Sequence, residues 1–109
     1  MRVVNPDTQE AVAPRGFISV GELVYNYPNP FMASQGTTFR YVTNDSVQSM
    51  TVRIFNLGGV PIDIVHQTDS NEVKWQNGEV HAGMYIYEME VTLSDGSGKH
   101  FKSMMEVRK

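Results

Sequence analysis

Residues 25–31 read Tyr-Asn-Tyr-Pro-Asn-Pro-Phe, and the two prolines in this stretch constrain the chain around them. A proline lacks the backbone N–H and fixes φ, so two prolines one residue apart exclude a helix here. The residue before each proline is driven toward extended geometry. We therefore expect Tyr27 and Asn29 to be extended, at the end of a strand that turns a rigid corner. Tyr25, Tyr27 and Phe31 supply aromatic surface on both sides of that corner.

The rest of the chain repeats one pattern, in which short apolar runs alternate with turn residues. No window of ten or more residues places apolar side chains at helical spacing, so helices are not expected. The pattern predicts strands at residues 23–27, 37–42, 50–57, 61–65, 72–75, 84–93 and 101–107. Seven short strands separated by turn signals predict an all-β fold, a seven-stranded antiparallel β-sandwich of the immunoglobulin-like or fibronectin-III-like type.

Turn residues and one aromatic corner support this assignment. The pair Gly58-Gly59 predicts a chain reversal, because glycine reaches positive φ without a steric cost. Residues 67–71 are polar and are expected to form a loop. Residues 83–85 (Gly-Met-Tyr) resemble a tyrosine corner, in which a tyrosine at the start of a late strand ties back the adjacent loop. Trp75 is expected in the core, since burying a large side chain contributes about 1.5–3 kcal/mol or more.

The last expected strand has two different faces. Phe101, Met105 and Val107 recur at even spacing, so they are expected to face the core. The outward side is then formed by Lys102, Met104, Glu106 and Arg108. Lysine on a sheet edge is an ordinary protection against aggregation. The alternative is that this positively charged strand, with its exposed methionine, is a surface for recognition.

The composition is that of one small domain. The chain has 109 residues, of which 40% are apolar and 10% aromatic, enough for a single packed core. A formal charge of −3 without a basic cluster gives no sign of a nucleic-acid partner. Residues 1–21 carry prolines and glycines among polar residues, so we interpret them as a linker or an extra edge strand. Residues 22–109 are expected to form the domain.

The sequence gives no sign of a membrane span or an enzyme site. It has no apolar run near 18 residues, no signal-peptide pattern at its start and no cysteine. If the domain is exported, we expect its export signal elsewhere in a longer parent. His66, His81 and His100 do not have metal-ligand spacing, and there is no G-x-S-x-G elbow or phosphate-binding loop. We therefore expect no catalytic activity, no metal and no cofactor.

Six short motifs follow one another in residues 22–109: the Pro-Asn-Pro-Phe stretch, then residues 37–41, 52–58, Trp75, residues 83–87 and residues 102–109. In this order and at this spacing they resemble the C-terminal sorting domains of the type IX secretion system. They are also similar to the related immunoglobulin-like domain of the flagellar hook-capping protein. The sequence departs from the family pattern at residues 75–78, where Trp-Gln-Asn-Gly replaces Trp-Asp-Gly, and at its Val-Arg-Lys end.

The resemblance implies a non-catalytic address that directs an upstream passenger to the bacterial surface. Its partners would be the type IX outer-membrane translocon or shuttle and a sortase, and its bacteria the Bacteroidetes. The implied location is secreted or on the outer membrane and cell surface, reached through the periplasm, and the domain is expected to be a monomer. The sorting or recognition residues implied by the resemblance are Pro28, Asn29, Pro30, Phe31, Leu57, Gly58, Gly83, Tyr85, Lys102, Met104, Val107 and Lys109.

Two other functions are compatible with the same sequence. The first is an immunoglobulin-like structural module of a flagellar hook cap or of an extracellular enzyme, which would share these motifs. The second is a carbohydrate-binding module, in which exposed aromatic or apolar residues stack on sugar. The candidates for that role are Tyr25, Phe55, Ile86 and, if it faces outward, Trp75.

Overall fold

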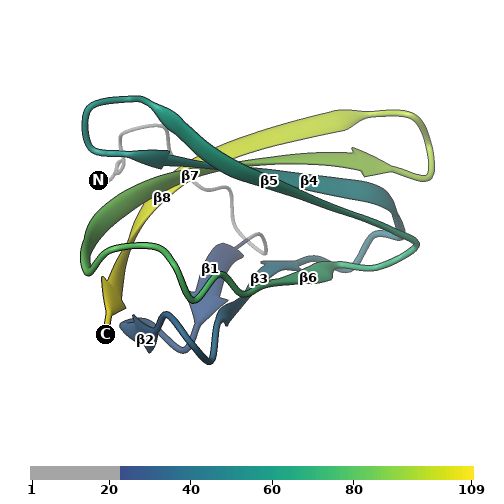
Figure 1. Ribbon diagram of the computed structural model, residues 1–109. Coiled ribbons are helices and arrows are strands. Elements are labelled where there is room, and N and C mark those ends of the chain that lie inside the picture. Colours follow the sequence, from purple (N-terminus) through teal and green to yellow (C-terminus); the bar gives the residue numbers. More distant parts are fainter. Residues whose placement is uncertain (1–22) are drawn as a thin grey trace, which may run out of the picture.

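The computed structural model describes residues 23–109, which form eight strands and no helix (Figure 1). The interpretation of residues 1–21 as a linker or edge strand lies outside the described residues. In the part of the chain that is described, no helix has the length and apolar character to cross a membrane. The strands are β1 (Leu23–Tyr27), β2 (Phe31–Met32), β3 (Thr37–Val42), β4 (Val47–Asn56), β5 (Pro61–Thr68), β6 (Glu72–Trp75), β7 (Gly83–Leu93) and β8 (Gly98–Arg108).

The strands form two sheets. In Figure 1, β4, β5, β7 and most of β8 make up the upper layer, β1, β3 and β6 make up the lower one, and the end of β8 with the short β2 reaches down to the lower level. The smaller sheet has the order β1-β3-β6 and is antiparallel. The larger sheet has the order β2-β8-β7-β4-β5, and all its pairs are antiparallel except β2 with β8, which is parallel. The all-β prediction is confirmed, but the prediction of seven wholly antiparallel strands is wrong. Strand β2 has two residues, too few for an alternation pattern in the sequence.

The two sheets share one core because their strands alternate buried and outward residues. In β7, Tyr85, Tyr87, Met89, Val91 and Leu93 are buried, and the residues between them are half-buried or exposed. Aromatic rings meet across the two layers. The ring centroids of Phe39 and Tyr87 are 4.8 Å apart, and those of Tyr41 and Phe101 are 5.2 Å apart. A period of two therefore gives each sheet one apolar face, and the two faces pack together.

Several strands extend beyond their predicted ends. Strand β5 continues to Thr68, so the prediction of a loop that begins at Gln67 is wrong. Gln67 and Thr68 are exposed, and their backbones pair with Met50 and Ser49 of β4. A strand can continue through polar residues when their side chains face water and a neighbour satisfies their backbone. The apolar pattern therefore underestimated the length of this strand.

Trp75 lies in the core, as predicted. It is 2% exposed, and its ring meets the edge of Phe31 with 6.0 Å between the ring centroids. Its indole Nε1–H donates to Oδ2 of Asp63 at 2.7 Å. Trp75 belongs to β6 of the small sheet and Asp63 to β5 of the large sheet. One side chain thus joins the two layers by both packing and a hydrogen bond to a carboxylate.

Ionisation of Tyr87 should make the unfolding free energy fall as the pH rises above 10. Burial raises the pKa of Tyr87 from 10.0 to about 12, partly opposed by a hydrogen bond to Ser103. The native state keeps this proton after the unfolded chain has lost it, so stability should fall as pH rises between these two values. The expected loss is about 2–3 kcal/mol of unfolding free energy by pH 12. Urea titrations between pH 9 and pH 12 would measure it.

Tyr87→Phe is the control for this pH prediction. The variant keeps the buried ring but has no hydroxyl proton to release. Its unfolding free energy should therefore decline less steeply above pH 10 than that of the parent. Equal slopes in the two proteins would show that other groups cause the alkaline loss.

Candidate functional site

The Pro-Asn-Pro corner holds the end of the last strand. The side-chain Oδ1 of Asn29 accepts the backbone N–H of Glu106 at 3.0 Å. Immediately afterwards β2 runs parallel to β8, with Phe31 opposite Val107. Both prolyl peptide bonds of the corner are cis, and Tyr27 ends β1, extended as predicted. The stretch that starts the sequence motif and the stretch that ends it are therefore in direct contact, although 77 residues separate Asn29 from Glu106.

The inner side of the corner is fixed by two buried polar residues. Asn26 and Thr37 are 6% and 1% exposed. The Thr37 hydroxyl donates to the carbonyl oxygen of Pro28 at 2.8 Å, and the Asn26 side-chain amide donates to Thr37 Oγ1 at 3.2 Å. Buried polar groups with partners rigidify their surroundings. The corner is thus a structural joint between the two sheets as well as part of the sequence motif.

The tyrosine corner is confirmed. The hydroxyl of Tyr85 donates to the carbonyl oxygen of His81 at 2.8 Å, which ties the loop before β7 to the start of that strand. Gly83, at the first position of β7, pairs with Val107 near the end of β8. Tyr85 is 8% exposed and Val107 is 1% exposed. These residues therefore organise the end of the large sheet from inside it.

The Gly58-Gly59 reversal is also confirmed, as the turn between β4 and β5. The backbone N–H of Gly59 donates to the carbonyl oxygen of Asn56 at 3.0 Å, and the N–H of Val60 donates to Asn56 Oδ1 at 3.0 Å. Asn56 pairs with Tyr85 of β7. The turn therefore lies at the same end of the large sheet as the tyrosine corner, on the left in Figure 1. Leu57 projects from this turn and is 59% exposed.

Ten of the twelve predicted site residues belong to this one end, where β4 ends, β7 begins and β8 ends: Pro28, Asn29, Pro30, Phe31, Leu57, Gly58, Gly83, Tyr85, Val107 and Lys109. The other two, Lys102 and Met104, lie farther along β8, opposite Glu88 and Ile86 of β7. Phe31, Tyr85 and Val107 are buried, so they can support a surface but cannot form one. The structure thus separates the supporting residues from those that a partner could touch.

The last strand faces in two directions, as predicted. Met105 and Val107 are buried and Phe101 is half-buried, whereas Lys102 and Arg108 are exposed. Met104 is 49% exposed. Glu106 lies outward and is half-buried.

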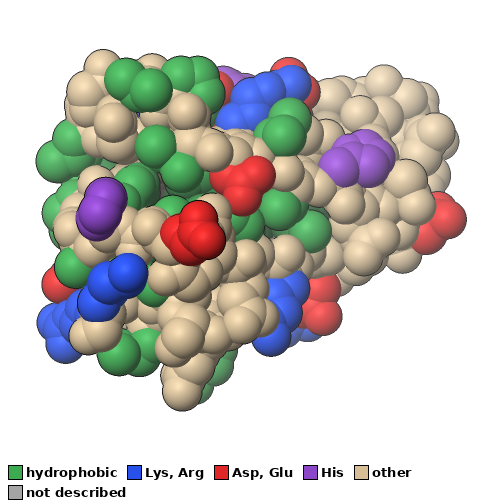
Figure 2. Space-filling view, viewed as in Figure 1, with side chains coloured by type: hydrophobic (Ala, Val, Ile, Leu, Met, Phe, Trp, Pro, Cys, Tyr) green, Lys and Arg blue, Asp and Glu red, His purple; other side chains and the backbone are tan. Residues whose placement is uncertain are grey.

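The outer surface of the large sheet includes exposed apolar residues on β5, β7, β8 and the β4–β5 turn. We call the following residues the apolar face: Leu57, Val60, Ile62, Ile64, Met84 and Met104. Half-buried Ile86 and Phe55 lie side by side in the pairing between β7 and β4, next to Met104 of β8. Figure 2 shows hydrophobic side chains along the upper left, over the region of the β4–β5 turn. Contiguous exposed apolar surface commonly marks an interaction site.

Of the apolar face, only Leu57 and Met104 were among the site residues predicted from the sequence. Ile62 and Ile64 were missed, although the residues around Asp63 do alternate. Asp63 points inward to bond Trp75, which places its two isoleucine neighbours on the outside. The alternation was therefore visible in the sequence. It would ordinarily place the isoleucines in the core and the aspartate in water, and the hydrogen bond of Asp63 to Trp75 gives the opposite arrangement.

The polar part of this outer surface is internally paired. Glu88 lies 3.6 Å from Lys102 Nζ and 3.9 Å from His100 Nε2, and Arg53 lies 3.1 Å from Glu90. The Lys102–Glu88 and Arg53–Glu90 pairs are ion pairs at the surface, and such pairs stabilise a fold by only about 0–1 kcal/mol each. The charges of this surface therefore have partners within the sheet.

The three histidines lie in different settings. His66 Nδ1 is 2.8 Å from the Thr51 hydroxyl, His81 accepts through its carbonyl oxygen, and His100 is beside Glu88. Across residues 23–109, no three or more His, Cys, Asp or Glu side chains are grouped so that they could hold a metal ion. The absence of a catalytic activity and of a cofactor stays a prediction.

The class that the geometry defines is an all-β protein of two sheets packed over one core. No family model matches the sequence, and no curated protein matches it. The fold is similar to that in the crystal structure of CopC from Methylosinus trichosporium OB3b, with a TM-score of 0.59. The match covers 79% of this chain and 92% of that chain at 16% identity. A likeness at this identity concerns the fold alone.

Proposed function

We propose that this chain is a non-catalytic C-terminal sorting domain that directs an upstream passenger through the type IX secretion system to the bacterial surface. The observation that carries the proposal is the apolar face, an exposed surface beside the end of the last strand. Four of the six motifs that resemble the family, residues 28–31, 52–58, 83–87 and 102–109, meet at the same end of the large sheet. The proposed partners are the outer-membrane translocon or shuttle and the sortase of that system.

The predicted residues have two kinds of role in this proposal. Phe31, Tyr85 and Val107 hold the end of β8 in place, and Asn29 fixes its backbone. Leu57 and Met104 are the exposed residues that a partner would contact, and Lys102 lies two residues before Met104 on the same face of β8. A partner that buried such apolar groups would gain about 25 cal/mol for each Å² removed from water.

The finer architecture and the location belong to the same proposal. The tyrosine corner and the two packed sheets support an immunoglobulin-like or fibronectin-III-like sandwich with the short β2 added to it. The domain would act as a monomer, on a secreted or surface-attached protein that has crossed the periplasm. A structural module of a hook cap would have the same internal joints, but it would not need the apolar face.

The test is the export of a reporter fused to the N-terminus of the whole chain in a bacterium that has the type IX system. Leu57→Ser combined with Met104→Ser should strongly reduce export, because the partner loses its apolar contacts. The control is Arg53→Ala combined with Glu90→Ala, which removes an ion pair from the same sheet. Surface changes of both kinds should alter the unfolding free energy by about 0.5 kcal/mol or less each. Thermal melts of the purified variants would check that both remain folded.

Each outcome of this experiment separates the proposal from its alternative. Export by the parent and by the control, together with accumulation of the Leu57/Met104 variant in the periplasm, would support sorting by this surface. Equal export of all three would refute the role of the apolar face. No export of the parent would refute the sorting function and favour a structural module. Removal of residues 105–109 is a poor test, because it deletes buried Met105 and Val107 and so disturbs the fold itself.

A further inference from the structure

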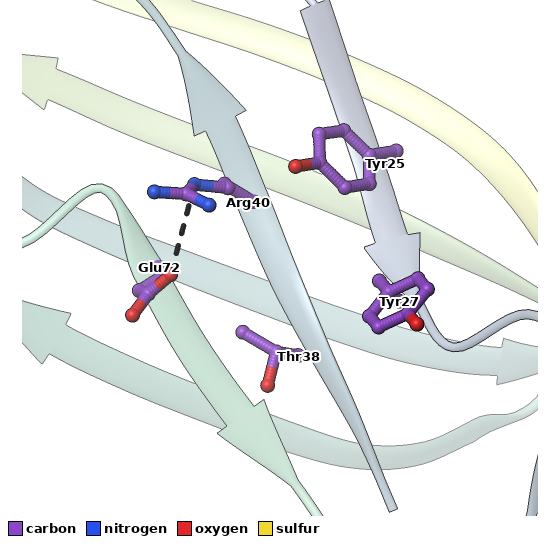
Figure 3. A pocket seen from close by; sticks show the side chains of 5 residues that line it. All are labelled: Tyr25, Tyr27, Thr38, Arg40 and Glu72. Atoms are coloured by element: carbon purple, nitrogen blue, oxygen red, sulfur yellow. Dashed lines mark ion pairs between the residues drawn. The ribbon is translucent and has the colours of Figure 1, made fainter.

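A second surface lies on the outer side of the small sheet, away from the apolar face. It is a groove of about 450 Å³ lined by Tyr25, Tyr27, Thr38, Arg40 and Glu72. A volume of this size falls in the range of small-ligand sites, about 300–1,000 Å³. Figure 3 shows the two tyrosine rings on β1 at one side of the groove and the Arg40–Glu72 pair toward the other.

The strand register sets the positions of these side chains. Tyr25 is opposite Arg40, and Arg40 is opposite Glu72, so these three residues cross the sheet in one row. Tyr27 and Thr38 begin the next row. Side chains two residues apart on a strand point the same way, so Tyr25 and Tyr27 project from backbone positions about 6–7 Å apart along β1. Two aromatic faces at this spacing can contact successive units of an extended chain ligand.

The rings are available to a ligand. Tyr27 is 73% exposed, the highest fraction among the exposed large apolar or aromatic side chains of residues 24–109, and Tyr25 is half-buried. A tyrosine combines an apolar ring face with a polar hydroxyl. It can therefore cover the C–H face of a sugar ring and also bond to a sugar hydroxyl.

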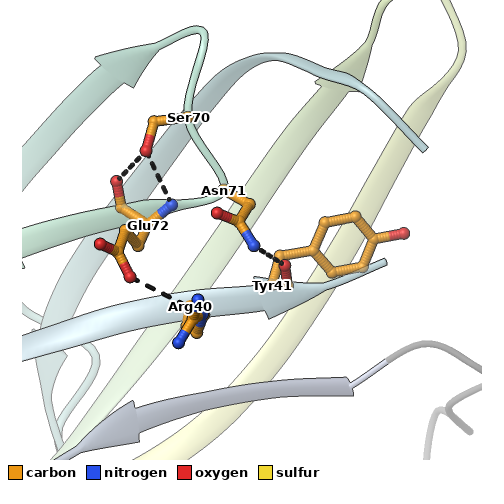
Figure 4. A network of polar contacts seen from close by, with 5 residues as sticks. All are labelled: Arg40, Tyr41, Ser70, Asn71 and Glu72. Carbon is orange, nitrogen blue, oxygen red and sulfur yellow. Dashed lines mark hydrogen bonds and ion pairs between the residues drawn. The ribbon is translucent and has the colours of Figure 1, made fainter. Parts of the chain in front are cut away.

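Hydrogen bonds in the turn before β6 fix the position of the charged side of the groove. Arg40 Nε lies 3.7 Å from Glu72 Oε1. The Ser70 hydroxyl accepts the Glu72 backbone N–H at 3.2 Å and donates to the Glu72 carbonyl oxygen at 3.0 Å. Asn71 reaches across to β3, where its side-chain amide donates to the Tyr41 carbonyl oxygen at 3.0 Å (Figure 4). This turn fixes the start of β6 against β3, so Glu72 is presented to the groove on a rigid support.

The charges of the groove favour an uncharged or weakly charged ligand with many hydroxyls. Arg40 and Glu72 neutralise each other, and each is about half exposed, with side-chain exposures of 47% and 49%. Together they offer both hydrogen-bond donors and acceptors. Lys74, next to Thr38 in the pairing with β6, leaves one surplus positive charge on this sheet. A phosphate-rich ligand would need a stronger positive field than this single lysine gives.

We propose that the outer face of the small sheet binds an oligosaccharide, with Tyr25 and Tyr27 stacking on sugar rings and the Arg40–Glu72 pair bonding to their hydroxyls. The site is independent of the apolar face and of the sorting proposal. It differs from the sequence-based candidates, because Trp75 is buried and Phe55 and Ile86 belong to the other sheet. Of those candidates only Tyr25 is part of it, and Tyr27 is the principal addition.

The test is an NMR titration of the ¹⁵N-labelled full chain with uncharged hexasaccharides of β-glucan, xylan, mannan and chitin. At least one should bind with a Kd of about 1 mM or tighter. It should shift the amide signals of β1, β3 and the start of β6. Tyr27→Ala should weaken that binding by roughly threefold to tenfold, and Tyr27→Phe should retain most of it because the ring remains. The Leu57→Ser/Met104→Ser variant should bind as the parent does.

Three results would overturn the inference. The first is no shift with any hexasaccharide at about 10 mM, well above the expected Kd. The second is binding whose shifts lie on the large sheet and are unaffected by Tyr27→Ala. The third is a failure of all the sugars together with binding of a proline decamer, which would assign the groove to a peptide. Because Tyr27 is so exposed, its replacement should leave the fold intact, and a thermal melt would verify this.

Discussion

Gly36→Ala should lower the unfolding free energy by about 3 kcal/mol or more, through backbone strain and a clash. Gly36 has a φ of +80°, a region that L-residues with a Cβ rarely adopt. An added Cβ would lie 2.9 Å from Cβ of Gln76 and closer still to the carbonyl oxygen of Trp75. The backbone of β6 cannot move away without disturbing its pairing with β3, where Thr37 is opposite Trp75.

Gly59→Ala is the matched control for this prediction. Gly59 has a φ of +85°, but an added Cβ would meet nothing within 4 Å. Its cost should therefore be the conformational part alone, about 1–2 kcal/mol. Urea denaturation with unchanged m-values would compare the two variants. Similar losses for both would show that the strand next to Gly36 yields easily and that the clash carries little energy.

The sequence predicted correctly those parts of the fold in which the alternation of apolar and polar residues within a single strand shows which side chains are buried. Strand β7 alternates from Met84 to Leu93, and Tyr85, Tyr87 and Met89 all face the core as the pattern indicates. The same holds for Met105 and Val107 in β8. In such strands burial depends on a period of two, which is visible without knowledge of the partner strand. The tyrosine corner was predictable for a similar reason, since its bond spans only four residues.

The features that were missed depend on segments far apart in the chain. Strand β2 exists because Phe31 and Met32 pair with the end of β8, and nothing local identifies so short a strand. The extension of β5 through Gln67 depends on the backbone of β4. The groove of the small sheet combines residues from β1, β3 and β6, whose rows follow from register. Register is set by packing between strands, so a sequence read along one strand does not reveal which side chains lie side by side.

The second large loss of stability is expected from replacing Trp75, which joins the two sheets. Trp75→Ala removes a side chain that is 2% exposed and packs on Phe31. Deletion of a buried aromatic of this size costs about 3–5 kcal/mol. The variant also removes the indole N–H that donates to Asp63, so this carboxylate between the two sheets loses its hydrogen bond. Because small domains are stable by only about 5–15 kcal/mol, Trp75→Ala should lose a large fraction of its stability.

Two further variants separate packing from the hydrogen bond in this loss. Trp75→Phe retains an aromatic ring without the N–H, and Asp63→Ala removes the acceptor. A double-mutant cycle between Trp75→Phe and Asp63→Ala should give a coupling of about 1.5–3 kcal/mol, the range for hydrogen bonds to charged groups. Urea denaturation of the four proteins would measure it. A coupling near zero would show that Asp63 is satisfied equally well by water. The loss in Trp75→Ala would then come from packing alone, and the two sheets would be joined by their apolar faces without help from this bond.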